Sequence, residues 1–190
     1  MMNEEILLVL SSLQEDLRVL RAEADIRRLM ARYMFLCDVP LPERTVSDTD
    51  RYEEILDLFT NDAVWEGVGS YYDNQFGRSV GRAELAAHFE RFFAPKQPEM
   101  ILNCHYLTSE QIHVTGDTAE GQWVHFQPWI FEDGSSVLRS SRLNNAFRRV
   151  ENKWKISRYR TENVFIAPLP VGWATNIPEM SSVMHVKKID

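Results

Sequence analysis

The chain has 190 residues, of which 44% are hydrophobic and 26% are charged, and its net charge at pH 7 is −7. This composition is that of a globular protein with a buried core, not of a disordered chain. The acidic balance argues against nucleic-acid binding, which needs a concentrated basic face. We therefore expect one domain over residues 1–190, with a helical extension at 1–24 and a tail at 166–190 that forms an ordered extension or a lid.

The N-terminal third is predicted to be helical in two stretches. In the first stretch, apolar residues recur at alternating steps of four and three, the spacing of a coiled-coil seam. They are Ile6, Leu10, Leu13, Leu17, Leu20 and Ala24. Such a seam can pack on its own domain or contact another subunit. We favour the second interpretation and expect a homo-oligomer, a trimer or a dimer. The second stretch ends near Asp38, because Pro40 and Pro42 forbid its continuation.

Shorter elements are predicted in the middle of the chain. Residues 51–59 have the pattern of an amphipathic helix that Asn61-Asp62 ends, and residues 63–68 resemble a short strand. Residues 71–80 are expected to form an irregular loop. A further helix is predicted from Gly81 toward Pro95.

The second half of the chain is rich in predicted strands, at 101–114, 118–131, 136–149 and 153–164. Helices followed by a long meander indicate an α+β fold, with helices on one face of an antiparallel sheet. Strand alternation places two sets of residues on one face each, polar side chains among aromatic ones, as in the wall of a ligand pocket. The sets are Trp123, His125, Gln127 and Trp129, then Ser141, Leu143, Asn145 and Phe147.

Three residues are candidates for chemistry. Tyr33 and Asp38 end an apolar helix, and a buried carboxylate needs a partner. His105 lies at the head of the meander, and an imidazole held by a carboxylate is a competent base near neutral pH. We therefore predict a direct hydrogen bond between Asp38 and His105. His88 and His113 are expected at the surface.

No cofactor is predicted. The five histidines lack metal-ligand spacing, and no nucleotide-binding glycine motif is present. Cys37 and Cys104 fit neither a disulfide framework nor a metal site. The chain also lacks a run of about 20 apolar residues and a basic signal-peptide start. We expect a cytoplasmic protein with reduced thiols that binds neither membrane nor nucleic acid.

Several fragments together resemble the SnoaL-like branch of the nuclear transport factor 2-like superfamily over about residues 22–165. They are Ala24–Tyr33 followed by Asp38, Leu58–Trp65, Gly81–Leu85, Asn103–Tyr106 and Phe147–Ile156. The resemblance implies a cone-shaped α+β fold, in which N-terminal helices wrap a curved antiparallel sheet. Within this branch the chain looks most like bile-acid 7α-dehydratase, scytalone dehydratase and hexachlorocyclohexane dehydrochlorinase.

Those enzymes use an Asp–His dyad to remove a proton while a leaving group departs. The resemblance implies that Asp38 and His105 form this dyad, and that Tyr33 matches a tyrosine of the bile-acid enzyme. The chain departs from the bile-acid enzyme at two positions. That enzyme has an aspartate where this chain has Gln127, and an arginine near the position of Asn163. This chain also lacks the lysine that the dehydrochlorinase has at the position of Tyr33.

The implied activity is that of a cofactor-independent lyase, a dehydratase or related elimination, acting on a cyclic, aromatic or steroid-like small molecule. His105 would be the general base, Asp38 would orient its imidazole, and Tyr33 would donate to a developing oxyanion. Side chains expected to line the pocket or orient the substrate are Trp65, Gln127, Trp129, Asn145 and Arg160.

Three other functions stay open. One is a formaldehyde-releasing carbon–carbon lyase acting on lignin-derived aromatics, which uses similar proton transfers. Another is the non-catalytic small subunit of a ring-hydroxylating dioxygenase. The third is a ligand-binding protein without turnover. The superfamily fold alone does not separate them.

Overall fold

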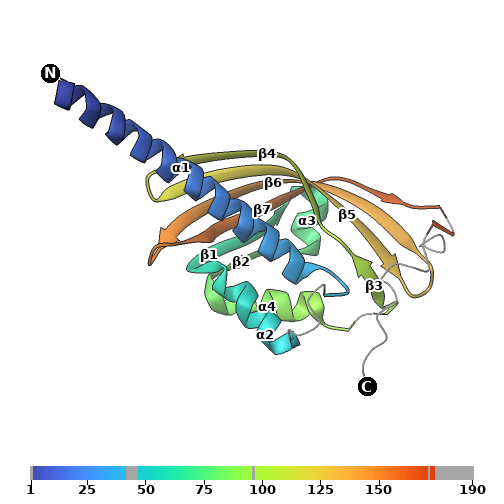
Figure 1. Ribbon diagram of the computed structural model, residues 1–190. Coiled ribbons are helices and arrows are strands. Elements are labelled where there is room, and N and C mark those ends of the chain that lie inside the picture. The colour runs from blue at the N-terminus through green and yellow to red at the C-terminus, as the bar shows by residue number, and fades with distance from the viewer. Residues whose placement is uncertain (1, 42–46, 96, 171, 174–190) are drawn as a thin grey trace.

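The computed structural model describes residues 2–41, 47–95, 97–170 and 172–173. Most of the predicted tail at 166–190 therefore lies outside the described residues. The chain forms a strongly curled sheet with helices packed against it, which confirms the predicted α+β class (Figure 1). None of the described helices is long and apolar enough to cross a membrane.

The helices are α1 (Met2–Cys37), α2 (Asp48–Asp57), α3 (Gly69–Gln75) and α4 (Gly81–Phe93). The two predicted N-terminal stretches are one continuous helix, because α1 contains neither glycine nor proline. The Ser47 side chain accepts a hydrogen bond from the Asp50 amide and caps the start of α2. The predicted irregular loop at 71–80 is wrong, since α3 and strand β2 occupy most of it.

The strands are β1 (Phe59–Val68), β2 (Arg78–Val80), β3 (Met100–Asn103), β4 (Tyr106–Thr115), β5 (Thr118–Phe131), β6 (Ser136–Val150) and β7 (Lys153–Pro168). Their order is β2-β1-β7-β6-β5-β3, and β4 also pairs with β5. All pairs are antiparallel except β1 with β7. Through that parallel pair β1, which follows the N-terminal helices, joins the meander beside its last strand, β7.

Two predicted boundaries are wrong. Phe59 begins β1, so the strand starts four residues earlier than the sequence suggests and the preceding helix ends at Asp57. The predicted strand at 101–114 is interrupted at Cys104 and His105, which belong to neither β3 nor β4. The interruption matters for function, because His105 leaves the ladder there.

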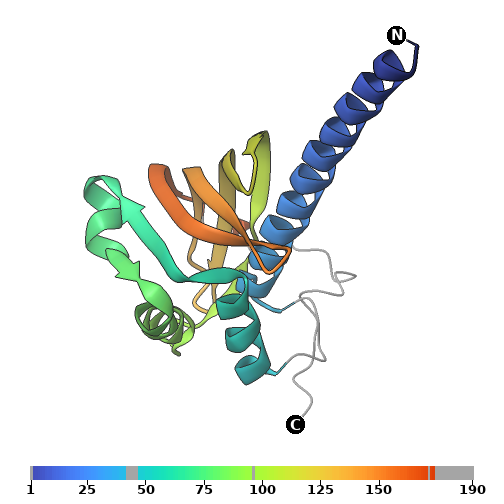
Figure 2. The same cartoon turned by 90° about the vertical axis from the view of Figure 1, so that its left-hand side faces the viewer.

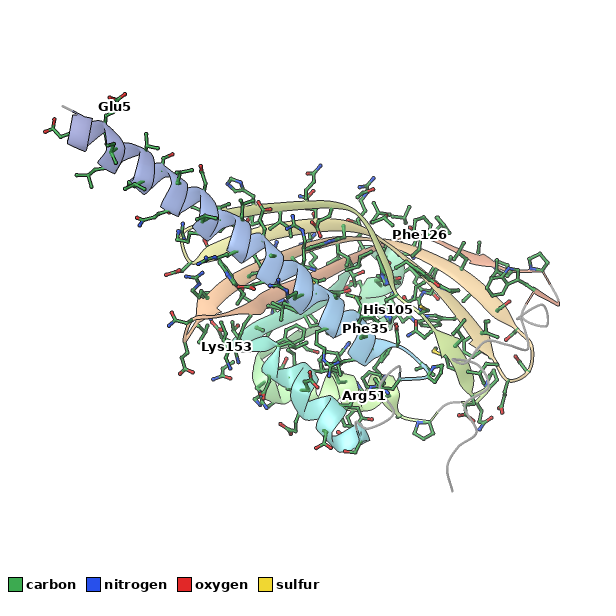
Figure 3. The ribbon with its side chains drawn as sticks, in the orientation of Figure 1. Glu5, Phe35, Arg51, His105, Phe126 and Lys153 are labelled. Carbon is green, nitrogen blue, oxygen red and sulfur yellow. The ribbon has the colours of Figure 1, made fainter. Side chains whose placement is uncertain are left out.

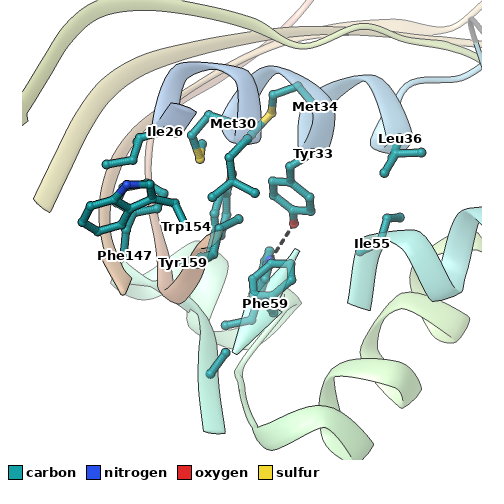
Figure 4. Close-up of a cluster of buried hydrophobic side chains, with 14 of the residues drawn as sticks. Ile26, Met30, Tyr33, Met34, Leu36, Ile55, Phe59, Phe147, Trp154 and Tyr159 are labelled. Atoms are coloured by element: carbon teal, nitrogen blue, oxygen red, sulfur yellow. Dashed lines mark hydrogen bonds between the residues drawn. The ribbon is translucent and has the colours of Figure 1, made fainter. Parts of the chain in front are cut away.

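The core lies between the inner face of α1 and the concave face of the sheet. Ala22, Ile26, Met30 and Tyr33 are buried at three- and four-residue steps along α1, which places them on one face of the helix. Ile26, Met30 and Tyr33 are labelled in Figure 4. The predicted inward sets on β5 and β6 are confirmed: all eight side chains are buried except Trp129, which is half-buried. His88 was predicted at the surface, but it is 5% exposed, and its ring packs at a tilt against Trp65 with the ring centroids 4.1 Å apart.

The first turns of α1 project away from this domain (Figure 2). Residues 4–17 are all exposed, and the helix meets the sheet only from Arg18 onward, where Nη1 donates to the Gly116 carbonyl. The C-terminal half of α1 is thus a core element, while residues 4–17 of the same helix are exposed.

Candidate active site

A main-chain bridge brings the end of α1 to the end of β3. The Val39 amide donates to the Asn103 carbonyl at 2.9 Å, and the Asn103 amide donates to the Val39 carbonyl at 2.8 Å. Asp38 and His105 flank this bridge, 67 positions apart in the chain. Their meeting therefore depends on backbone hydrogen bonds that neither residue makes itself.

Asp38 and His105 make the hydrogen bond predicted from the sequence. Asp38 Oδ1 lies 2.6 Å from His105 Nδ1 and also accepts the His105 backbone N–H at 3.0 Å. Both side chains are nearly buried, at 11% and 7% exposure. Because a carboxylate can only accept, His105 Nδ1 carries the proton that it donates. The contact fixes the ring in one orientation (His105 is labelled in Figure 3).

A row of amides fixes the other nitrogen of His105. The Asn103 Nδ2 group donates to the Cys37 carbonyl, so that its Oδ1 faces Gln127. Gln127 Nε2 then donates to Asn103 Oδ1 at 2.6 Å and approaches His105 Nε2 at 3.0 Å. A donor there requires a lone pair on His105 Nε2. The neutral imidazole is therefore protonated on Nδ1 and basic at Nε2.

Arg51 holds the C-terminal end of α1 in place. Its Nε donates to the Leu36 carbonyl at 2.7 Å and its Nη2 donates to the Asp38 carbonyl at 2.9 Å. The guanidinium is buried and lies 4.0 Å from the centre of the Phe93 ring. A cation at a helix C-terminus satisfies open carbonyls and complements the helix dipole. Arg51 thereby positions the main chain that carries Asp38.

The dyad opens into a cavity between α1, α4 and the concave face of the sheet. Half of the residues that line it carry large aromatic rings: Tyr33, Trp65, Tyr72, Phe76, Phe89, Phe92, Trp129 and Tyr159. Its polar side chains are His88, His105, His125, Gln127, Ser141 and Thr161. An apolar pocket with a few convergent polar groups is typical of a small-molecule site.

A second imidazole lies directly beside the dyad. The His125 ring stacks parallel to that of His105, with centroids 5.1 Å apart and an interplanar angle of 1°. Burial lowers the pKa of His125 well below 6.5, and the charges of His105 and Arg139 lower it further. His125 is therefore neutral. Its buried Nε2 has no hydrogen-bond partner within the described structure.

Tyr33 closes the floor of the cavity. Its hydroxyl accepts a hydrogen bond from Trp65 Nε1 at 2.9 Å (dashed in Figure 4), and its ring packs edge-on against Phe59 and Tyr159. Burial raises the pKa of Tyr33 well above 10, so the phenol keeps its proton. Burial also raises the pKa of Cys37, one turn further on, to about 12. Cys37 is thus a thiol and not a nucleophile.

Arg139 is a buried cation next to the cavity wall. It is 2% exposed, and its guanidinium lies 4.0 Å from the Trp129 ring centre and 5.1 Å from that of Tyr72. Nη2 donates to Gln75 Oε1 at 2.7 Å, and no carboxylate of the described chain forms an ion pair with it. Burial lowers its pKa from 12.5. Aromatic faces therefore stabilise this charge.

The structure brings together six of the eight site residues predicted from the sequence. Tyr33, Trp65, His105, Gln127 and Trp129 line the cavity, and Asp38 lies behind His105. Asn145 does not line the cavity: it is buried under α1, where its Oδ1 accepts the Arg160 backbone N–H. Arg160 does not line it either.

The position of Arg160 follows from strand parity. Its neighbours Tyr159 and Thr161 point into the cavity, so the Arg160 side chain points to the opposite face of β7. There it lies 3.5 Å from Glu66. Sequence reasoning placed His125 on the inward face but did not count it as a site residue, and it missed Tyr72 and His88. The alternation that identified Gln127 and Trp129 also contained His125, whereas only the tertiary fold buries His88.

No group of three or more His, Cys, Asp or Glu side chains in the described ranges is arranged to hold a metal ion. The prediction of a cofactor-free site stays a prediction.

Comparisons with known proteins agree on the domain. The family model described as SnoaL-like domain matches residues 18–160. A candidate aromatic ring hydroxylase from Novosphingobium aromaticivorans is 28% identical, with a TM-score of 0.59, over 77% of this chain and 92% of that one. A search of the curated proteins found no significant match.

Two more distant structures share the fold. A candidate scytalone dehydratase from Novosphingobium aromaticivorans is 16% identical, with a TM-score of 0.60, over 80% of this chain and 90% of its own. A type 3 hexachlorocyclohexane dehydrochlorinase from Novosphingobium barchaimii is 17% identical, with a TM-score of 0.59, over 79% of this chain and 91% of that one. At such identities the likeness establishes the fold alone.

Proposed function

This chain belongs to the SnoaL-like domain family, and we propose that it is a cofactor-independent lyase that eliminates a small leaving group, such as water, from a cyclic aromatic substrate. The observation that carries the proposal is the dyad. Asp38 holds His105 Nδ1–H at 2.6 Å, which leaves a basic Nε2 at an aromatic cavity.

The elimination uses both nitrogens of His105. Nε2 takes a proton from a substrate carbon, the C–H electron pair forms a double bond, and the bond to the leaving oxygen on the next carbon breaks. The departing hydroxide takes up a proton and leaves as water. Asp38 stabilises the imidazolium that forms meanwhile, as the carboxylate of a catalytic triad does. In this scheme Gln127 gives up its contact with Nε2 when the substrate arrives.

Two donors can serve the leaving oxygen. One is the imidazolium of His105, which returns the proton it took. The other is the Tyr33 phenol, which keeps its proton because burial raises its pKa. If Tyr33 only stabilises developing charge, Tyr33→Phe should slow turnover by roughly 10- to 100-fold, less than loss of the dyad does. If it is the obligatory acid, the two losses should be equal.

The cavity wall supports the substrate class. Trp65, Tyr72 and Trp129 offer flat apolar faces that suit an aromatic or polycyclic ring. Two buried polar atoms of the wall have no partner in the described chain, namely His125 Nε2 and Trp129 Nε1. Because an unpaired buried polar group is costly, each of them suits a hydroxyl or carbonyl group of the ligand. The 28% identity to a candidate aromatic ring hydroxylase agrees with an aromatic ligand.

The proposal is tested by turnover. The purified chain, without added metal, is incubated with a panel of phenolic and steroidal cyclic alcohols and halides, and the new conjugated double bond is followed by ultraviolet absorption. His105→Ala should abolish the product. His113→Ala is the matched control, since His113 lies on the neighbouring β4 and is exposed.

Other results would assign a different function. Turnover retained in folded His105→Ala would falsify the mechanism. Formaldehyde released from diaryl propane diols would favour the carbon–carbon lyase. Aromatic ligands bound without turnover by the wild type would favour a ligand-binding protein or a non-catalytic subunit.

A further inference from the structure

Helix α1 carries two apolar faces on nearly opposite sides. The inner face, which includes Ala22 and Ile26, packs on the sheet. The outer face is the seam predicted from the sequence. Of its six residues Ala24 is half-buried, and the other five are between 49% and 59% exposed: Ile6, Leu10, Leu13, Leu17 and Leu20. Leu20 and Ala22 are two positions apart, which is about 200° around a helix. The seam therefore cannot be buried by the fold that α1 belongs to.

We propose that residues 6–20 of α1 form a parallel coiled coil with the same segment of another copy of this chain. This segment lies outside the part of the domain that the domain family shares, apart from its last three residues, since the family match begins at residue 18. The interface is therefore a feature of this chain and not of its fold.

The projecting part of α1 needs a partner to be stable. The side chains of residues 4–17 are all exposed in the described chain, and isolated helices of this length are marginal in water. Exposed leucines along one line add the free-energy cost of hydrating apolar surface. Because the C-terminal half of α1 is already helical and packed on the sheet, the projecting half does not need to nucleate a new helix. A partner therefore stabilises it by burying the apolar seam.

The seam is complementary to itself. Steps of four and three residues place Leu10 and Leu17 at heptad positions a, and Ile6, Leu13 and Leu20 at positions d. In a parallel pair each a residue meets its counterpart, and so does each d residue. The seam residues of two copies can therefore pack against each other without a partner of different sequence.

The flanking charges favour the parallel direction. Asp16 occupies position g and Arg21 occupies the following position e, which face each other across a parallel coiled coil. Both are exposed, and neither has an ion-pair partner among the described residues. By contrast, Glu15 is already bound to Arg18, and Asp25 to Arg28. An antiparallel pair would set g beside g and lose this attraction.

The same charges argue against a membrane as the occupant. A helix that lies on an anionic bilayer carries lysine and arginine on its polar face. The charged residues of α1 before Arg18 are all acidic: Glu4, Glu5, Glu15 and Asp16. A second copy of the chain is the partner that matches both the apolar seam and the charges.

The first experiment measures the mass of the full-length chain by sedimentation at about 1–100 μM. Wild type should be an oligomer. Leu10→Gln with Leu17→Gln keeps helix propensity but removes two seam positions, and should weaken association by at least roughly 100-fold. The matched control is Leu8→Gln, which makes the same change at position f, the outermost of the helix, where Leu8 is 72% exposed. It should change association by less than about threefold.

A second experiment detects the coiled coil even if another surface also holds the copies together. Leu20→Cys places a thiol opposite its counterpart in a parallel pair only, within disulfide distance, so oxidation should yield a covalent dimer. Leu8→Cys should not. Asp16→Arg alone should weaken association roughly 10-fold through like charges, and adding Arg21→Asp should restore it.

Three results would overturn the proposal. They are a monomeric wild type at 100 μM, equal effects of the seam and Leu8 changes, and no crosslink at Leu20→Cys. A monomer that binds anionic vesicles would assign the seam to a lipid surface instead. Circular dichroism checks that each variant is folded. If a seam variant does not fold, the Asp16→Arg and Arg21→Asp variants still test the coiled coil.

Discussion

Replacing Asp38 by asparagine tests the dyad most directly, because the shape stays and the charge goes. Asp38 Oδ1 accepts two hydrogen bonds from His105, at 2.6 Å from Nδ1 and 3.0 Å from the backbone nitrogen. An amide oxygen can accept both. The Asp38→Asn variant should therefore fold, at a cost of about 1–2 kcal/mol for exchanging a charge-assisted hydrogen bond for a neutral one.

The catalytic loss should be larger than the loss of stability. When His105 takes a proton, the carboxylate and the imidazolium are charges about 4 Å apart, which attract by about 4 kcal/mol at an effective dielectric constant of about 20. This attraction exists only after proton transfer, so its loss raises the barrier. At about 1.4 kcal/mol per factor of ten, kcat should fall roughly 1000-fold.

The assay is steady-state turnover of the first substrate that the panel identifies, with unfolding in urea as the check on stability. The matched control is Asp62→Asn, which alters an exposed carboxylate that pairs with Arg148. Nitrogen NMR of the His105 ring gives a reading without substrate: wild type should be protonated on Nδ1. A kcat of folded Asp38→Asn within about tenfold of wild type would refute the reasoning, since an unneeded charge cannot stabilise the transition state.

The remaining predictions concern three buried positions. Gln127→Leu should cost about 1–3 kcal/mol in urea unfolding, because it leaves the fully buried Asn103 Oδ1 without its donor; Gln122→Leu, on the exposed face of the same strand, should not. Because burial lowers the pKa of His125, stability should depend on pH: below about pH 6.5 this histidine takes up a proton in the unfolded chain but stays neutral in the folded one. The free energy of unfolding should therefore fall by up to about 1.4 kcal/mol for each pH unit below that value. His125→Leu should flatten this slope when thermal melts of both proteins are compared between pH 5 and 7. Equal slopes would contradict a neutral His125. Gly121→Ala should destabilise by about 1–3 kcal/mol in thermal melts, because its Cβ would lie 2.4 Å from the Trp123 ring; an unchanged melting temperature would mean that the ring moves freely.

Much of the architecture could be read from local patterns in the chain. The three- and four-residue steps from Ile26 to Cys37 mark one face of a helix, and that face is the one buried in α1. Alternation along 118–131 places Trp123, His125 and Gln127 together, and β5 has those bounds. Such patterns are legible because each depends on the repeat of a single element, whose period is set by backbone geometry.

The family resemblance supplied what periodicity could not, that Asp38 and His105 belong together. Spacing alone offers no reason for residues 67 positions apart to meet. Only the tertiary structure shows the cause: the Val39–Asn103 bridge and the Arg51 clamp set the end of α1 beside the gap between β3 and β4. These contacts join elements distant in sequence and leave no periodic trace.

The misplaced residues have the same origin. Arg160 was expected in the pocket, yet the register of β7 turns Tyr159 and Thr161 inward and Arg160 toward Glu66. A shift by one residue exchanges the two faces of a strand, so the register decides which side chains meet the ligand. The sequence by itself determined the long helices, the long strands and the chemical groups available, but not the short α3 and β2. The tertiary structure decided which of those groups face the cavity, because burial and pairing depend on all the elements packing at once.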